Sequence, residues 1–120
     1  MMKTAPTLRL HALQVAQLTR YCTLYRSYLW QCVLPTPERN QMVRRLQVIQ
    51  GRLEKVQEQG ATEINLPLTA EEKATLQQLF RGLTQCTASE PPSEQRTRKL
   101  TELTTLRMHI ERLGRQTSAL

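Results

Sequence analysis

Residues 36–60 read TPERNQMVRRLQVIQGRLEKVQEQG. Thr36 is a preferred N-cap residue, and Pro37 suits the first position of a helix because its fixed φ already matches helical backbone. Apolar residues then recur at steps of three and four, which is the period of an amphipathic helix. They are Val43, Leu46, Ile49, Leu53 and Val56. Gly60 is a typical C-terminal stop, so this stretch predicts a helix over 37–58.

The same period continues on both sides of this stretch, so the chain is expected to be helical throughout. A capping box at Thr69–Glu72 and the N-cap residue Ser93 begin two later helices. The intervening residues 61–68 are expected to form a loop. The three further helices are predicted over 8–33, 70–87 and 94–116. The stripe of the first is Leu8, His11, Val15, Leu18, Cys22, Tyr25, Leu29 and Cys32, which makes His11 a core residue. The stripe of the last is Leu100, Leu103, Leu106, Ile110 and Leu113.

The second and fourth helices share more than their period. At a shift of 57 residues their stripes coincide, the cap Thr36 meets the cap Ser93, and Arg39 meets Arg96. The first and third helices align in the same way at a shift of 54. We therefore expect one all-α domain over 1–120, a four-helix bundle made of two similar hairpins, with an internal duplication of 8–58 and 69–116.

The composition argues against several classes of protein. The chain has 120 residues and no aspartate, and no nucleotide-binding or hydrolase motif occurs in it. Cys22, Cys32 and Cys86 lack the spacing of a zinc site, and an odd number of cysteines is typical of a reducing compartment. No run approaches the roughly 20 apolar residues that cross a bilayer. We expect a cytoplasmic protein with no enzymatic activity, no metal and no cofactor.

Charge is distributed unevenly along the chain. The formal net charge is +7, from 17 basic and 10 acidic side chains. Residues 1–55 carry nine basic side chains against two acidic ones, a balance of +7. Residues 56–92 carry two against five, a balance of −3, and residues 93–120 carry six against three, a balance of +3. The basic excess therefore belongs mainly to the first two predicted helices.

The outer face of the second helix is the first candidate site. Opposite the stripe lie basic residues at helical spacing that could follow a phosphate backbone. They are Arg44, Arg45, Arg52 and Lys55, and the corresponding basic residues of the fourth helix are Arg98 and Arg112. A solvated surface or a site for an acidic protein remains an alternative. A membrane surface is disfavoured, because the basic helices lack exposed Trp, Phe or Leu beside these charges.

The first helix carries the second candidate site, an unusually wide apolar sector. Beside its stripe lie Leu10, Leu13, Tyr21, Leu24 and Tyr28, and Trp30 lies further round. They widen the apolar sector to roughly 220°, where a surface helix needs about 100° or somewhat more. Either this helix is central in its own bundle, or the flank contacts another copy or a helical partner. Trp30 suits a protein contact or stacking on an unpaired base.

These features favour a non-enzymatic subunit that associates with itself or a partner and binds nucleic-acid backbone without sequence preference. The alternative is a protein–protein adaptor or structural subunit whose basic faces are only solvated. The two hypotheses differ in which surface is functional: the basic face of 37–58 in the first, the apolar flank of 8–33 in the second.

Overall fold

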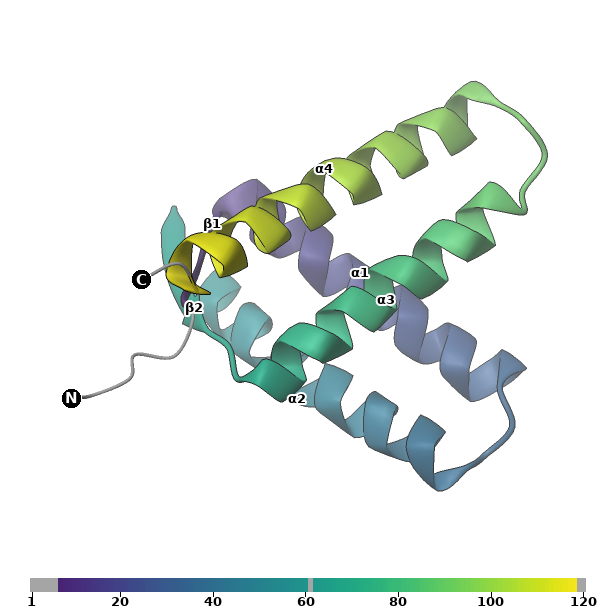
Figure 1. Ribbon diagram of the computed structural model, residues 1–120, viewed down its shortest axis with the longest axis horizontal. Helices are drawn as coiled ribbons and strands as arrows, with labels where there is room; N and C mark the ends of the chain where they lie inside the picture. The colour runs from purple at the N-terminus through teal and green to yellow at the C-terminus, as the bar shows by residue number, and fades with distance from the viewer. Residues whose placement is uncertain (1–6, 61, 119–120) are drawn as a thin grey trace. The chain divides into compact units, whose positions relative to one another are not determined.

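The computed structural model describes residues 7–60 and 62–118 (Figure 1). Its helices and strands follow in the order β1 (Thr7–His11), α1 (Ala12–Cys32), α2 (Pro37–Glu58), β2 (Glu63–Pro67), α3 (Ala70–Ala88) and α4 (Glu94–Ser118). Four helices arranged as two hairpins confirm the predicted all-α fold class. The helix boundaries for α2, α3 and α4 agree with the predicted ones to within two residues, the usual uncertainty of a helix end.

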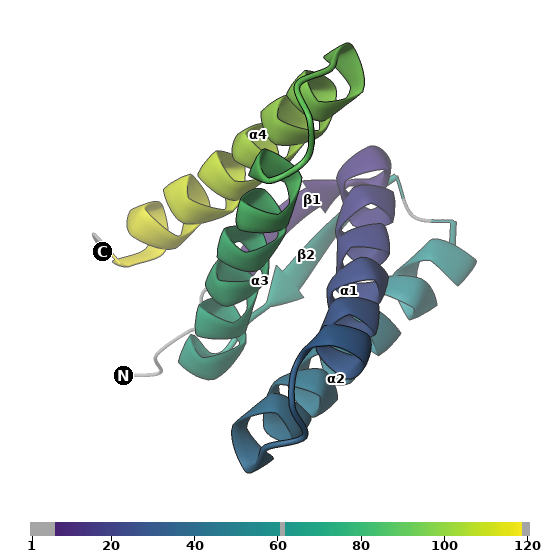
Figure 2. The same ribbon diagram turned by 90° about the vertical axis from the view of Figure 1, so that its right-hand side faces the viewer.

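The chain divides into two compact units, which we describe separately. One, the α1–α2 unit, spans Leu10–Ile64, and the other, the α3–α4 unit, comprises Met1–Arg9 and Asn65–Leu120. Within them α1 packs against α2 and α3 packs against α4 (Figure 2). The boundary between the units crosses both short strands, which pair with each other in a two-stranded sheet.

Local chemistry explains where α2 begins and ends. The Thr36 hydroxyl accepts a hydrogen bond from the Arg39 backbone N–H at 3.1 Å, and Pro37 occupies the first helical turn. After the helix, Gly60 has a φ of 68°, a left-handed conformation in which glycine avoids the clash that a Cβ causes. The predicted start and stop signals of this helix are therefore confirmed.

Each unit buries its own apolar stripe. In the α1–α2 unit the buried stripe residues are Val15, Leu18, Cys22, Tyr25, Leu29, Val43, Leu46, Ile49 and Leu53, as predicted. In the α3–α4 unit Leu76, Leu79, Phe80, Leu103, Leu106 and Ile110 are buried. Cys32, placed in the first stripe by its spacing, is exposed instead. The side chains of Leu8 and Leu113 lie outside the described residues.

The start of the first helix was predicted wrongly. Thr7–His11 form β1, and α1 begins only at Ala12. The His11 Nδ1 accepts from the Gln14 backbone N–H at 3.4 Å, while the Gln14 Oε1 accepts from the His11 backbone N–H at 3.1 Å. This capping box stops the helix from extending toward the N-terminus. His11 is therefore an exposed cap residue and not a core residue.

The expected loop at 61–68 is also partly wrong, because Glu63–Pro67 form β2. The Ala12 backbone N–H donates to the Thr62 carbonyl oxygen at 3.1 Å. The end of β1 thus lies beside the start of β2, the arrangement of an antiparallel pair. A two-stranded pair is too small to be stable alone, so it needs support from the rest of the chain.

The two hairpins use equivalent residues at equivalent places. Thr69 and Glu72 form a capping box at the start of α3, as His11 and Gln14 do at the start of α1. The two caps are 58 positions apart, which is about one helical turn more than the shift of 54 from the apolar pattern. The duplication itself stays a prediction. Aligning α1 with α3 by their caps corresponds to a shift of 58 residues.

Candidate nucleic-acid interface

Three basic side chains of α2 share its solvent face. Arg44, Arg52 and Lys55 are exposed, whereas Arg45 is half-buried. At 100° per residue, the first three lie within about 60° of the direction opposite the fully buried Leu46. The rise from Arg44 to Lys55 is about 16 Å at 1.5 Å per residue. The exposed three form what we call the α2 basic face.

Glu54, the acid nearest in sequence to this face, is engaged elsewhere. Its Oε1 accepts a hydrogen bond at 2.8 Å from the side-chain amide of Gln50, which is buried. Around the helix, Glu54 lies about 100° from Lys55. Its carboxylate is therefore directed toward the flank of α2 that meets α1 and away from Lys55.

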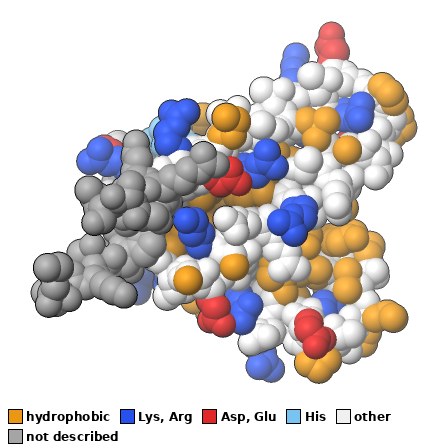
Figure 3. All heavy atoms as spheres, in the orientation of Figure 1, with side chains coloured by type: hydrophobic (Ala, Val, Ile, Leu, Met, Phe, Trp, Pro, Cys, Tyr) orange, Lys and Arg blue, Asp and Glu red, His pale blue; other side chains and the backbone are white. Residues whose placement is uncertain are grey.

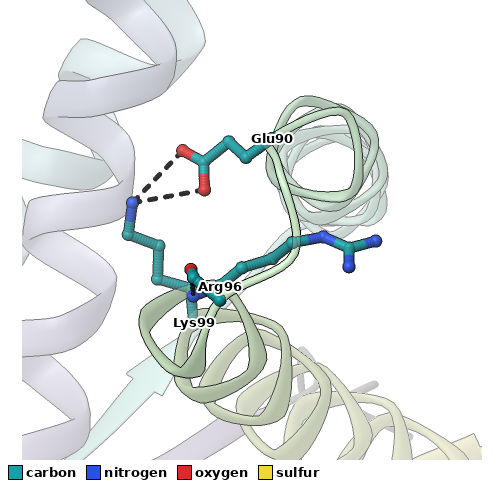
Figure 4. A network of polar contacts seen from close by, with 4 residues as sticks. Glu90, Arg96 and Lys99 are labelled. Atoms are coloured by element: carbon teal, nitrogen blue, oxygen red, sulfur yellow. Dashed lines mark hydrogen bonds and ion pairs between the residues drawn. The ribbon is translucent and has the colours of Figure 1, made fainter.

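The predicted basic residues of α4 belong to the other unit. Arg98 and Arg112 are exposed. Neighbouring cations are engaged. Lys99 Nζ pairs with Glu90 Oε1 at 3.2 Å (Figure 4). Arg96 Nη2 donates to the Ala88 carbonyl oxygen at 3.1 Å. His109 Nε2 lies 2.9 Å from the Arg9 carbonyl oxygen. The α4 side chains thus form a second, sparser basic surface that we treat apart from the α2 basic face.

The apolar flank predicted on the first helix is only partly exposed. Leu13 is 63% exposed, Leu24 51% and Tyr28 38%, whereas Leu10 and Tyr21 are buried, which corrects their placement on an accessible surface. Leu10 belongs to β1, so helical spacing does not apply to it. The Tyr21 ring, with the Arg20 guanidinium 5.4 Å from its centroid, widens the buried side of α1 instead.

Trp30 does not lie with the other exposed apolar residues of α1. It is 67% exposed, and at 100° per residue it lies roughly 100–160° around the helix from Leu13, Leu24 and Tyr28. Hydrophobic side chains gather in the region where the ends of α1 and α2 are joined, at the lower right of Figure 3. The four exposed residues of the predicted six-residue interface therefore lie on two surfaces, and Trp30 belongs to the second.

The second surface is a groove of mixed polarity along one edge of the α1–α2 hairpin, with a volume of about 390 Å³. We call it the Trp30 groove. Its lining residues are Thr23, Arg26, Ser27, Trp30, Gln31, Val43 and Gln47. Sequence reasoning missed it, because the stripe pattern identifies buried positions and does not show which polar residues two packed helices bring together.

Hydrogen bonds fix one wall of this groove. Arg26 Nη1 donates to Gln50 Oε1 at 2.8 Å, and Gln50 Nε2 donates to Thr23 Oγ1 at 3.0 Å. The Arg26 Nε is buried and has no hydrogen-bond partner in the structure described. An unmet buried donor costs free energy, and such groups are commonly satisfied by a water or a ligand. Arg26 thus lines the groove with Nη1 bonded to Gln50 and with Nε shielded from solvent.

Arg39 connects the groove to the helix ends. It is 8% exposed, and its Nη1 donates to the Val33 carbonyl oxygen at 3.3 Å and to that of Trp30 at 3.5 Å. Its Nε and Nη2 both donate to Asn40 Oδ1, at 3.1 and 2.7 Å. The guanidinium carbon lies 4.7 Å from the Trp30 ring centroid, within the range of a cation–π contact. One face of the indole is thereby covered.

Among residues 7–60 and 62–118, no group of three or more His, Cys or acidic side chains could hold a metal ion. No described helix is both long and apolar enough to cross a membrane. None of the protein-family models, curated proteins or solved structures compared with the chain matches it.

Proposed function

We propose that this protein is a non-enzymatic nucleic-acid-binding subunit, and that its α2 basic face contacts the phosphate backbone without reading sequence. The observation that carries this proposal is the exposure of Arg44, Arg52 and Lys55 on one side of a helix, with Glu54 bonded to Gln50 on another flank. Arginine suits phosphate because its guanidinium presents a planar set of donors. The helix supplies positive charge over about 16 Å, enough for several phosphates.

The test is a salt titration of binding. Wild-type protein and the variant Arg44→Gln/Arg52→Gln/Lys55→Gln are titrated against fluorescein-labelled single- and double-stranded oligonucleotides of scrambled sequence, from 50 to 200 mM NaCl. Binding by counterion release weakens steeply with salt, by nearly one unit of logarithmic slope per phosphate contact. We expect the triple variant to bind more weakly and its slope to fall by up to about three units on duplex DNA.

A charge-matched variant separates this site from overall charge. Arg20→Gln/Lys73→Gln/Arg81→Gln removes the same three charges from α1 and α3, outside the α2 basic face. It should retain most of the wild-type affinity and salt slope. Equal losses in both variants would reduce the effect to net charge, and an unchanged slope in the α2 variant would contradict the proposal.

A second candidate function is a protein–protein adaptor. The observation that favours it is the exposure of Leu13, Leu24 and Tyr28 within one sector of α1, since apolar and aromatic side chains mark the centre of many interfaces. Size-exclusion chromatography with light scattering measures the assembly of wild type and of Leu13→Gln/Leu24→Gln. Dissociation by that variant, with the circular dichroism unchanged, supports the adaptor. A wild-type monomer contradicts self-association.

A further inference from the structure

The Trp30 groove has the size of a small-ligand site. Unlike the buried core, it is lined mostly by polar side chains. Its volume of about 390 Å³ lies within the roughly 300–1,000 Å³ of small-molecule pockets. Threonine, serine and glutamine side chains line it together with one cation and one indole. A ligand suited to this lining has an aromatic surface, hydrogen-bonding groups and a negative charge.

The indole is available for stacking on one side. Arg39 lies over one face of the ring at 4.7 Å, yet Trp30 remains 67% exposed, so the exposed part includes the opposite face. A tryptophan with that exposure keeps most of its contact with water. A planar aromatic ligand stacked on the ring would remove that contact. The cation already stacked on the far face makes a sandwich of guanidinium, indole and ligand possible.

The second hairpin provides an internal comparison. Arg96 Nη2 donates to the Ala88 carbonyl oxygen, as Arg39 Nη1 donates to that of Trp30, so Ala88 occupies the position of Trp30. The spacing from Trp30 to Ala88 is 58, the same as between the caps of α1 and α3. The hydrogen bond from an arginine of a hairpin's second helix to a carbonyl oxygen at the end of its first helix therefore forms without an aromatic side chain. At that spacing Thr84 replaces Arg26, so both groove residues are absent from the other hairpin.

The groove also adjoins the α2 basic face. Gln47 lines the groove and Arg44 belongs to the basic face. Residues three apart on a helix have Cβ atoms about 5–6 Å from each other. A chain of phosphates held by the basic face thus passes close to the edge of the groove.

We propose that the Trp30 groove takes one unpaired base of a single-stranded nucleic acid, stacked on the exposed face of Trp30, with the positive charge of Arg26 beside the nucleotide. This inference rests on the proposed nucleic-acid function and adds a preference for single strands over duplexes. A base within a duplex cannot reach the groove without leaving its stack, which costs a few kcal/mol. Stacking on an aromatic side chain tolerates any sequence, because every base has a flat face.

Trp30 is the only tryptophan of the chain, so its own fluorescence reports the contact. Wild-type protein is titrated at 50 mM NaCl with a twelve-nucleotide thymidine oligomer and with a twelve-base-pair duplex. We expect the single strand to quench the indole emission strongly and the duplex to quench it little. Fluorescein-labelled versions of both probes give the affinities of Trp30→Ala, whose emission is absent.

We expect Trp30→Ala to lose roughly 5- to 100-fold in affinity for the thymidine oligomer, the usual effect of removing one stacking side chain, and to bind the duplex as wild type does. The matched control is Leu34→Ala, which removes an apolar side chain that is 79% exposed and lies outside the groove. It should bind both probes with unchanged affinity. Circular dichroism of each variant checks the fold.

The remaining outcomes overturn the inference in distinguishable ways. If Trp30→Ala binds both probes as wild type does while the α2 triple variant binds neither, the groove proposal is wrong and the proposed function stands. If wild type binds neither probe, both are wrong. If a twelve-residue glutamate peptide quenches Trp30 and the oligonucleotide does not, the groove belongs to an acidic protein partner.

Discussion

Burial gives the three cysteines of this chain different chemistry. Cys22 is buried, Cys32 is exposed and Cys86 is half-buried. Desolvation raises the pKa of the Cys22 thiol from 9.0 to about 12, an effect that the nearby charge of Arg26 only partly offsets. The thiolate is the reactive form. With a thiol-exchange reagent at pH 8 we expect Cys32 to react first and Cys22 only after unfolding; a Cys32→Ala variant identifies the fast phase.

The same pKa shift makes stability depend on pH. In the folded protein the Cys22 thiol stays protonated, whereas in the unfolded chain it ionises above its ordinary pKa of 9.0. Its contribution is therefore complete below pH 9 and is lost as the pH rises toward 12. In urea titrations the free energy of unfolding should be about 2 kcal/mol lower at pH 10.5 than at pH 8. The Cys22→Ala variant should not show this loss. Equal losses in the two proteins would contradict the shift.

Arg39 and Arg96 allow a paired test of a second residue-scale effect. Arg39 is 8% exposed and donates to three acceptors, Asn40 Oδ1 and the carbonyl oxygens of Trp30 and Val33. Arg96 has one such bond in the structure, to Ala88, and is half-buried. We expect Arg39→Met to lower the free energy of unfolding by about 2–3 kcal/mol and Arg96→Met by about 1 kcal/mol. Urea titration measures both, and a larger loss at Arg96 would contradict this ranking.

At the scale of the helices, one glycine lies inside α2 and another follows its end, and the same substitution should change stability in opposite directions at the two positions. Gly51 lies inside the helix, and Gly60 follows it with a φ of 68°. A Cβ at either position meets no atom within 4 Å, so backbone conformation decides both effects. We expect Gly51→Ala to raise stability by about 0.5–1 kcal/mol and Gly60→Ala to lower it by about 1–2 kcal/mol. Thermal unfolding of both variants tests the pair.

The helices were predictable to the extent that their ends carry standard caps. Thr36, Thr69 and Ser93 are frequent N-cap residues, and the helices after them begin where predicted. His11 is a rare cap, so its box with Gln14 was not recognised, and the helix was extended back through β1. Leu8 and Leu10 are two residues apart, which is the period of a strand, and only the wide apolar sector assigned to the first helix could include both.

The candidate surfaces were predictable in part for a related reason. The exposure of Arg44, Arg52 and Lys55 follows from their spacing within a single helix, and the sequence shows that spacing directly. The Trp30 groove depends on Arg26, Thr23 and Gln50 from two helices, and that combination requires knowing how α1 and α2 pack. Tyr21 shows the same limit, because packing and not spacing decided that it is buried.

At the scale of the whole chain, a formal net charge of +7 sets two effects of salt against each other. Screening weakens the mutual repulsion of the basic side chains, which stabilises the folded chain, and it also weakens ion pairs. The pairs Lys99–Glu90 at 3.2 Å and Arg107–Glu111 at 4.0 Å are substantially exposed, and exposed pairs contribute little. Because 17 basic side chains face only 10 acidic ones, repulsion should dominate the balance.

We accordingly expect the midpoint of thermal unfolding to rise between 20 and 300 mM NaCl, by roughly 2–5 °C if screening contributes 0.5–1 kcal/mol. Replacing NaCl by KCl should give the same rise, because screening depends on ionic strength and not on the identity of the cation. A falling midpoint would mean that ion pairs outweigh repulsion. Bound nucleic acid should raise the midpoint of thermal unfolding above that of the free protein. The nucleic-acid proposal predicts that this difference between the two midpoints becomes smaller as salt rises, because salt weakens phosphate binding while it stabilises the free chain.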